Sequence, residues 1–250
     1  MSEECAMAEE GRLWVAGCEL VATPEGGLYW PARKTLIVAD LHMEKGSAFA
    51  CKGLMLPPYD TPSTLAVIDA LMGRYRPQRV IALGDSFHRE DGHLGLTGDA
   101  RALIAGLTGK TDWIWIAGNH DPAPPLGLGG SARAEISIDG LSFRHGPRAG
   151  SGAGAGAGEI AGHLHPVARL RSRGRVIRRR CFASDGQRLV MPAMGAYAGG
   201  LNVLDAAFAG LFPPRRFHAW MLGSDRVYPL RASRLIPDPG VVQQRRAGAA

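Results

Sequence analysis

The chain has 250 residues, 46% of them hydrophobic, which is enough for one large α/β domain, and no break in composition divides it. Its 29 basic and 23 acidic residues give a formal net charge of +6. Four widely spaced cysteines argue against a disulfide framework or a cysteine-based zinc site and favour a reducing cytoplasm, and in the absence of a signal-peptide pattern or a long apolar run we expect no membrane association.

Three short antiparallel strands are predicted first, at residues 13–15, 19–22 and 28–30. Apolar runs of strand length follow at residues 36–39, 80–83 and 113–117, and an amphipathic helical pattern lies in each interval, at residues 61–76 and 100–109. This alternation predicts a βαβαβ core with parallel strands and right-handed crossovers. Residues 44–53, just before the first helix, are expected to form either a rim loop or a short helix.

Past Asp121 the pattern changes to hairpins and loops. The Asp139-Gly140 and Asp185-Gly186 pairs predict hairpin turns, and the Gly-Ala repeat that ends at Gly158 predicts a flexible loop. In chain order, we expect a hairpin at 135–143, a flexible loop at 149–158, a hairpin at 175–191, a helix at 201–211, strands at 217–222 and 226–230, and a disordered tail from about residue 236.

Five apolar runs end in residue types that bind metals. These endings are Asp40-Leu41-His42, Gly84-Asp85, Gly118-Asn119-His120-Asp121, Arg144-His145 and Gly162-His163-Leu164-His165. In open α/β sheets ligands bind beyond the carboxyl ends of the strands, and Asp, Asn and His supply the donors that suit divalent zinc, manganese or iron. One Asp-x-His pair would be a weak signal, but the ordered set predicts a metal site.

Basic charge is concentrated between Arg169 and Arg180, where seven of twelve residues are arginine. Two interpretations remain open: a solvated hairpin edge whose charges discourage edge pairing, or a surface that contacts phosphates. The cluster begins four residues after His165, which favours a polyanionic substrate near the metal site.

These motifs, in this order over residues 40–165, resemble those of the calcineurin-like metallophosphoesterases. A narrower resemblance is to the bacterial ligase-associated DNA damage response endonucleases of that superfamily, in residues 39–49, 56–61, 84–88, 144–147 and 195–203. The resemblance implies an α/β fold, a four-layer αββα sandwich with a dinuclear metal site at the strand carboxyl ends. It also implies one domain over residues 1–250, in which the terminal strands complete the second sheet.

The same resemblance implies a role for each motif residue. One metal would be held by Asp40, His42, Asp85 and His165, and the other by Asp85, Asn119, His145 and His163. Asp85 would bridge two divalent ions, expected to be manganese, with zinc or iron as alternatives, and a metal-activated hydroxide would attack the phosphorus. His120 would donate a proton to the leaving oxygen or stabilise the phosphate, and Asp121 would orient His120.

One position departs from the phosphoprotein phosphatase branch of the superfamily. That branch reads Gly-Asp-x-x-Asp-Arg at its second motif, whereas here His88 replaces the second Asp and Arg89 follows. The carboxylate that normally pairs with the third-motif histidine is therefore missing, which argues against a phosphoprotein phosphatase. We assign His88 and Arg89 to substrate binding instead.

The expected function is a metal-dependent phosphodiesterase or endonuclease that acts on DNA during repair, with a ligase and a helicase as partners implied by the resemblance. The alternatives are a small-molecule phosphoesterase or nucleotide pyrophosphatase, and a non-catalytic scaffold of the same fold. A scaffold need not keep every ligand and His120, so the complete set favours an enzyme. The sequence carries no signal for oligomeric state.

Overall fold

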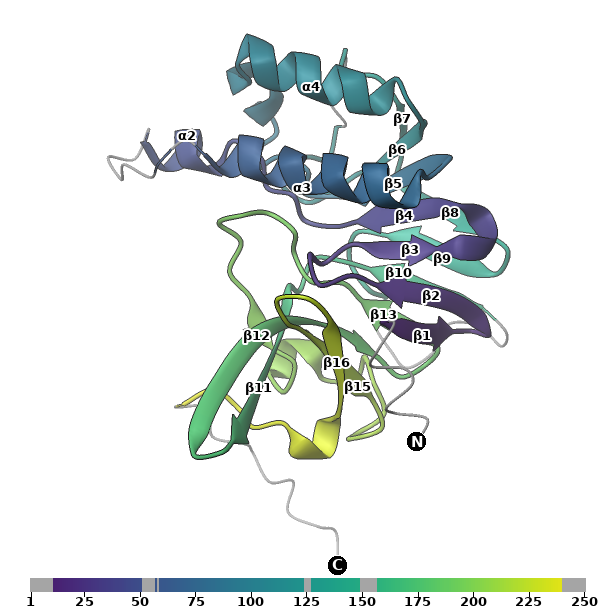
Figure 1. Ribbon diagram of the computed structural model, residues 1–250, viewed down its shortest axis with the longest axis vertical. Coiled ribbons are helices and arrows are strands. Elements are labelled where there is room, and N and C mark those ends of the chain that lie inside the picture. The colour runs from purple at the N-terminus through teal and green to yellow at the C-terminus, as the bar shows by residue number, and fades with distance from the viewer. Residues whose placement is uncertain (1–10, 51–56, 58, 124–126, 149–156, 240–250) are drawn as a thin grey trace, which may run out of the picture.

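Two β-sheets pack face to face in the computed structural model, which describes residues 11–50, 57, 59–123, 127–148 and 157–239 (Figure 1). The first sheet has seven strands in chain order: β1 (Arg12–Val15), β2 (Cys18–Ala22), β3 (Leu28–Trp30), β4 (Thr35–Val38), β5 (Arg79–Leu83), β6 (Asp112–Ile116) and β7 (Ser131–Arg133). Strands β1 to β4 pair antiparallel, and β4 to β7 pair parallel. The expected early strands and parallel core are confirmed.

The second sheet has nine strands: β8 (Glu135–Ile138), β9 (Leu141–Arg144), β10 (Gly158–Ala161), β11 (Pro166–Ser172), β12 (Arg175–Ser184), β13 (Arg188–Val190), β14 (Leu201–Asn202), β15 (His218–Leu222) and β16 (Val227–Arg231). The hairpins β8–β9 and β12–β13 were predicted, whereas β7 and β11 were not. Strand β15 pairs with β12, and β16 pairs with β15, so the terminal strands complete this sheet as expected.

The main core lies between the two sheets. Fully buried side chains from the inner face of the first sheet, such as Ile37 and Ile81, meet Phe143, Ile160 and Phe182 of the second. Burial of one such side chain contributes about 1.5–3 kcal/mol, so this layer fixes how the two sheets face each other. The strand ends that carry the predicted metal ligands are held in register by this packing.

Helices cover the outer face of the first sheet (Figure 1). They are α3 (Asp60–Tyr75) and α4 (Gly98–Thr108), whereas the short α2 (Lys45–Ala50) lies beyond the strands at the start of α3. The apolar stripe of α3, including Leu65 and Ile68, packs with Ile104 of α4 on Val80 and Trp113 of the sheet. Both predicted crossover helices are confirmed, and the segment after His42 is a short helix.

The outer face of the second sheet is covered differently. Its apolar residues pack under loops and short 3₁₀ turns that include η3 (Ala206–Phe208) and η4 (Ala232–Arg234), while 3₁₀ turns η1 (Pro31–Arg33) and η2 (Gly92–Gly95) lie elsewhere. The predicted helix at 201–211 is wrong. Asn202 and Asp205 each accept a hydrogen bond from a backbone N–H two residues ahead, at 3.0 and 2.9 Å, which favours turns over a helix.

Two loop predictions need correction at their edges. Gly158, the last residue of the predicted flexible loop, begins strand β10, and residues 149–156 lie outside the described residues. The predicted tail includes Ile236, whose N–H donates to the Arg169 carbonyl at 2.8 Å, so its first residues lie along β11; residues 240–250 are outside the described residues. No helix among the described residues is long and apolar enough to cross a membrane.

Candidate metal centre

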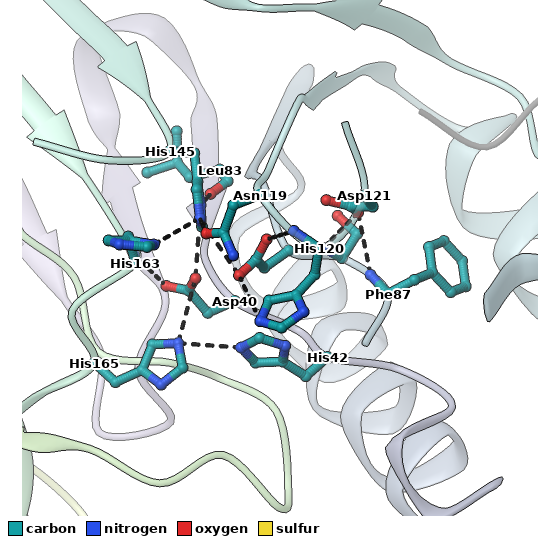
Figure 2. A network of polar contacts seen from close by, with 12 residues as sticks. Asp40, His42, Leu83, Phe87, Asn119, His120, Asp121, His145, His163 and His165 are labelled. Atoms are coloured by element: carbon teal, nitrogen blue, oxygen red, sulfur yellow. Dashed lines mark hydrogen bonds and ion pairs between the residues drawn. The ribbon is translucent and has the colours of Figure 1, made fainter. Parts of the chain in front are cut away.

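The predicted ligands converge where the strands end. Asp40 and His42 follow β4, Asp85 follows β5, Asn119 follows β6, His145 follows β9, and His163 and His165 follow β10. Backbone hydrogen bonds join the first two loops: the His42 N–H donates to the Asp85 carbonyl at 2.9 Å, and the Met43 N–H donates to Ser86 at 2.9 Å. Figure 2 shows the side chains of both sheets pointing into one space.

The backbone at this site is unusual. Five of the predicted ligands have left-handed φ values, namely Asp40 (52°), His42 (43°), Asp85 (46°), His163 (71°) and His165 (46°). Left-handed conformations of residues with side chains cost of order 1–3 kcal/mol each and cluster at functional sites. They turn the chain sharply after each strand, which brings the ligand side chains back over the sheet ends.

Glycines beside the ligands leave the room that these side chains occupy. A Cβ at Gly84 would lie 2.6 Å from the His145 ring, and one at Gly162 would lie 2.5 Å from the Asp40 carboxylate. At Gly118 it would lie 2.2 Å from the Asp85 nitrogen. A larger residue at any of these three glycines would therefore collide with a predicted ligand.

One cluster contains Asp40, His42 and His165. The Nε2 atoms of His42 and His165 lie 3.1 Å apart, and the His165 Nε2 lies 3.4 Å from Asp40 Oδ1. Burial, together with the charge of His165, lowers the pKa of His42 to about 3, so its imidazole is neutral and carries a free lone pair. Neutral imidazole is the form that binds metals.

The second cluster contains Asp85, His145 and His163. His145 Nε2 lies 3.0 Å from His163 Nδ1, 3.4 Å from Asp85 Oδ2 and 2.8 Å from Asn119 Oδ1. Its Nδ1 lies 2.9 Å from the Leu83 carbonyl, which fixes the ring orientation. Two atoms that each lie about 2.0–2.2 Å from one metal ion must lie within about 4.4 Å of each other, and the three distances to His145 Nε2 satisfy that limit.

Electrostatics couple the two clusters. Burial opposes the ionisation of Asp85, but the hydrogen bond and charge of His145 prevail and lower the pKa of this carboxyl to about 2. Burial likewise opposes the charging of His145, yet the hydrogen bond to Asp85 and the charge of Asp40 raise its pKa to about 9. His145 therefore lies between the two buried carboxyl groups of Asp40 and Asp85, at 3.7 and 3.4 Å.

The residues present fit divalent ions. Among the described residues, the buried Asp40 Oδ1 and His42 Nδ1 have no hydrogen-bond partner, although a buried polar atom normally has one. The donors are carboxylate oxygens, imidazole nitrogens and one amide oxygen, which suit zinc, manganese or iron. Asp85 Oδ1 accepts the His120 N–H at 2.9 Å while Oδ2 faces His145. Its role as a bridge stays a prediction.

The predicted catalytic residues occupy different environments. The His120 side chain is 43% exposed, and its ring stacks on His88 with centroids 5.3 Å apart. The buried Asp121 carboxylate accepts the N–H groups of Ser86 and Phe87, at 2.8 and 3.1 Å, and burial raises its pKa to about 7. Among the described residues no hydrogen bond or ion pair joins it to the His120 ring. Asp121 therefore holds the loop of Asp85, and its role in orienting His120 stays a prediction.

The predicted substrate-binding pair is separated by the structure. His88 lies half-buried beside His42 and His120, within the site. The Arg89 side chain is half-exposed and forms an ion pair with Asp91 at 3.2 Å. His88 therefore lies within the site and Arg89 lies in a surface ion pair, and substrate binding by either residue stays a prediction.

Sequence reasoning missed the support behind the first cluster. The segment after β13 runs beside the ligand loop, where the Met194 N–H donates to the Ala39 carbonyl at 2.9 Å. Arg180 donates to the Ala193 carbonyl at 2.7 Å, and Arg178 donates to the Gly200 carbonyl at 2.9 Å. These arginines hold that segment, a role that a run of basic residues does not reveal.

A two-sheet sandwich with two adjacent carboxylate and imidazole clusters at its strand ends defines a metal-dependent hydrolase. Residues 33–172 match the family model described as calcineurin-like phosphoesterase, and the chain belongs to that family. The crystal structure of the Pseudomonas putida nuclease MPE is similar, with a TM-score of 0.67 and 26% identity over 88% of this chain and 100% of that chain. No curated protein matches the chain. The protein is a metal-dependent phosphoesterase.

Proposed function

We propose that this phosphoesterase hydrolyses phosphodiester bonds in DNA. The observation that carries the proposal is the pair of metal-ligand clusters, Asp40 with His42 and His165 and Asp85 with His145 and His163, lying beside the exposed imidazole of His120. The similar Pseudomonas putida protein is named as a nuclease, which supports a nucleic-acid substrate. The family resemblance extends the proposal to DNA repair, with a ligase and a helicase as partners.

Two divalent ions fit the proposed reaction, one in each cluster, with Asn119 as a further ligand of the second. Manganese is proposed because the donor set mixes carboxylate, amide oxygen and imidazole, and zinc or iron would also fit. When bound, such ions supply a nucleophile by acidifying water, and they neutralise charge that develops on the phosphoryl oxygens.

The remaining steps belong to side chains of the protein. Asp85, buried between both clusters, would bridge the ions and set their separation. His120 would donate a proton to the leaving oxygen, because its ring is open to solvent and its backbone N–H is fixed by Asp85 at 2.9 Å. Asp121 would keep the Asp85 loop in place through the N–H groups of Ser86 and Phe87.

A small-molecule phosphoesterase is the second candidate. It is favoured by the internal contacts of Arg178 and Arg180, since arginines that bind the protein's own carbonyls are less available to a polyanion. Four other arginines of the cluster are exposed and keep the DNA proposal first.

Hydrolysis of single- and double-stranded DNA oligonucleotides and of bis-p-nitrophenyl phosphate, with added manganese, tests the proposal. We expect the protein to cleave at least one DNA and the small diester, and a chelator to abolish both activities. Cleavage of the small diester with neither DNA cleaved would overturn the DNA proposal in favour of the second candidate.

A further inference from the structure

A row of stacked rings leads from the metal centre to α2. The His120 ring stacks on His88 at 22°, with centroids 5.3 Å apart, and His88 stacks on Phe49 at 26°, with centroids 5.9 Å apart. Phe49 is half-buried and belongs to none of the three hydrophobic clusters of the described residues. Its ring therefore lines the rim of the site instead of completing a core.

A cation accompanies this ring. The ammonium of Lys45, one helical turn earlier, lies 5.9 Å from the centroid of the Phe49 ring, at the edge of the cation–π range. Among the described residues, no carboxylate lies within ion-pair distance of Lys45. An aromatic face and a lysine available to an anion thus stand together on one helix, close to His88.

Helix α2 has only six residues, but it is anchored. The carboxylate of Glu44, just before the helix, accepts hydrogen bonds from the hydroxyls of Ser47 at 2.6 Å and Thr61 at 2.9 Å. The N–H of Gly46 donates to the buried Asp60 carboxylate at 3.0 Å. These bonds tie α2 to the start of α3, so Phe49 and Lys45 are held at a fixed place on the rim.

We propose that Phe49 and Lys45 form a subsite for an unpaired nucleotide, in which Phe49 stacks on the base and Lys45 binds the next phosphate. The inference rests on the proposed function. If His120 protonates the leaving oxygen, the nucleoside that carries this oxygen lies on the His120 side of the metal centre. The row of stacked rings begins on that side. Stacking is available to every base, and aromatic rings alternating with cations are how proteins bind single strands without reading sequence.

The subsite has a consequence for the choice of substrate. A base within a duplex has both faces covered by its neighbours, so only an unpaired or displaced base offers a face to Phe49. The preferred substrate is therefore single-stranded DNA or an unpaired segment of a duplex. Because the contacts are a ring face and a phosphate, cleavage has little preference for base identity.

The test compares two single-stranded substrates of equal length and charge, a thymidine oligomer and an abasic oligomer. KM and kcat are measured with the metal-loaded parent, Phe49→Leu, Phe49→Tyr and Trp14→Leu. Trp14 is the matched control, because its side chain is also partly exposed but lies on β1 at the far edge of the first sheet. Binding of both labelled oligomers is measured separately by fluorescence anisotropy in a chelator, which prevents cleavage.

We expect the parent to have a KM about tenfold lower for the thymidine oligomer than for the abasic one, within the range that base stacking contributes. Phe49→Leu should remove this ratio in both KM and binding, whereas Phe49→Tyr and Trp14→Leu should keep it. Lys45→Ala should weaken both oligomers alike and reduce the salt slope of binding by about one.

A base preference that survives Phe49→Leu, or a loss that is equal on both oligomers, overturns the subsite and leaves the proposed function standing. If the parent cleaves neither oligomer while it hydrolyses a small diester, the proposed function itself fails and the subsite falls with it. Equal metal content in all variants separates either result from damage to the metal centre.

Discussion

Asp85 has a backbone conformation and a buried charge that both oppose the stability of the fold. It is buried, it has a left-handed φ of 46°, and its carboxylate stays ionised beside His145. The backbone conformation alone costs about 1–3 kcal/mol, and a buried charge adds to that cost unless it is paired. A residue held in this way is placed for its ligand, and Gly84 and Gly118 provide the space that it needs.

Replacing Asp85 by alanine should therefore remove metal from the protein. If Asp85 bridges two ions, each loses a ligand at once, and the content should fall from two equivalents per chain to less than one. Elemental analysis of the purified protein measures this. Asp91→Ala is the matched control, because that carboxylate is exposed and forms an ion pair with Arg89 at the surface. Two equivalents bound to Asp85→Ala would show that the bridging assignment is wrong.

His120 is expected to separate binding from chemistry. Its backbone N–H donates to Asp85 Oδ1 at 2.9 Å and its Nε2 lies 3.9 Å from Asp85 Oδ2, but it belongs to neither ligand cluster, so His120→Ala should keep the metals. A positioned proton donor contributes about a hundred- to ten-thousandfold, and kcat should fall within that range. Steady-state hydrolysis of a small diester at matched metal content measures it, with His93→Ala as the control. A fall of less than about threefold would remove His120 from the mechanism.

At the scale of elements, the sequence predicts a helix or strand correctly where the hydrophobic pattern of the segment alone indicates it. The buried runs of β4, β5 and β6 and the apolar stripes of α3 and α4 are visible in the chain because burial imposes their period. The ligands follow from their positions just after these runs. Their grouping into two clusters depends on the left-handed turns at His163 and His165 and on packing between the sheets, which no local pattern records.

The wrong helix prediction at 201–211 also reflects tertiary packing that no local pattern shows. Residues 201–211 are apolar enough for a helix, but Val203, Phe208 and Leu211 are buried on the second sheet, and Asn202 and Asp205 hold the backbone in turns. Here tertiary burial outweighs helical propensity. The hydrogen bonds of the Asp121 carboxylate to a loop 34 and 35 residues away are likewise a tertiary contact that no local pattern shows.

One buried ion pair joins the strands behind the second metal cluster. Glu159 of β10 and Arg188 of β13 are 2% and 3% exposed and pair with each other, and Arg188 also donates to the Leu211 carbonyl at 2.9 Å. Removing one partner of a buried pair costs about 3–5 kcal/mol, because a charge is left buried and uncompensated. Glu159→Ala should lower the free energy of unfolding by that amount.

Urea denaturation followed by tryptophan fluorescence measures this change. The matched control is Glu135→Ala, which breaks the exposed ion pair of Glu135 with Arg148 at 3.1 Å. Exposed pairs contribute about 0–1 kcal/mol, so the control should shift the midpoint little. Similar shifts for both variants would show that the buried Glu159 pair contributes no more to the free energy of unfolding than an exposed pair does.

At the scale of the whole molecule, the arginine cluster divides into two sets. Arg169 donates to the Pro237 carbonyl, Arg178 pairs with Asp238 at 3.2 Å, and Arg180 donates to the Ala193 carbonyl. The β11–β12 register places all three on one face of the hairpin, so this set binds the C-terminal segment and the loop behind the metal centre. The other set is exposed and has no ion pair among the described residues: Arg171, Arg173, Arg175 and Arg179.

Only the exposed set is available to a nucleic-acid backbone, so it provides a clean test of substrate class. Each phosphate that an arginine neutralises releases counterions, which adds about 0.7–0.9 to the slope of log affinity against log salt. Replacing all four exposed arginines by alanine should therefore lower the slope for DNA by up to about 2.8–3.6. Hydrolysis of a small phosphodiester needs only the metal centre and should be unchanged.

The control must change net charge equally without touching the hairpin. Alanine at Arg12, Arg33, Arg74 and Arg79 removes the same four charges from surface ion pairs in the other half of the molecule. A fall in slope specific to the hairpin variant means that β11 and β12 lie along the bound strand. At physiological salt, charges are screened over about 8 Å, so only arginines close to the bound DNA should change the slope. Equal slopes for both variants would therefore mean that the hairpin does not contact DNA and is only a solvated edge.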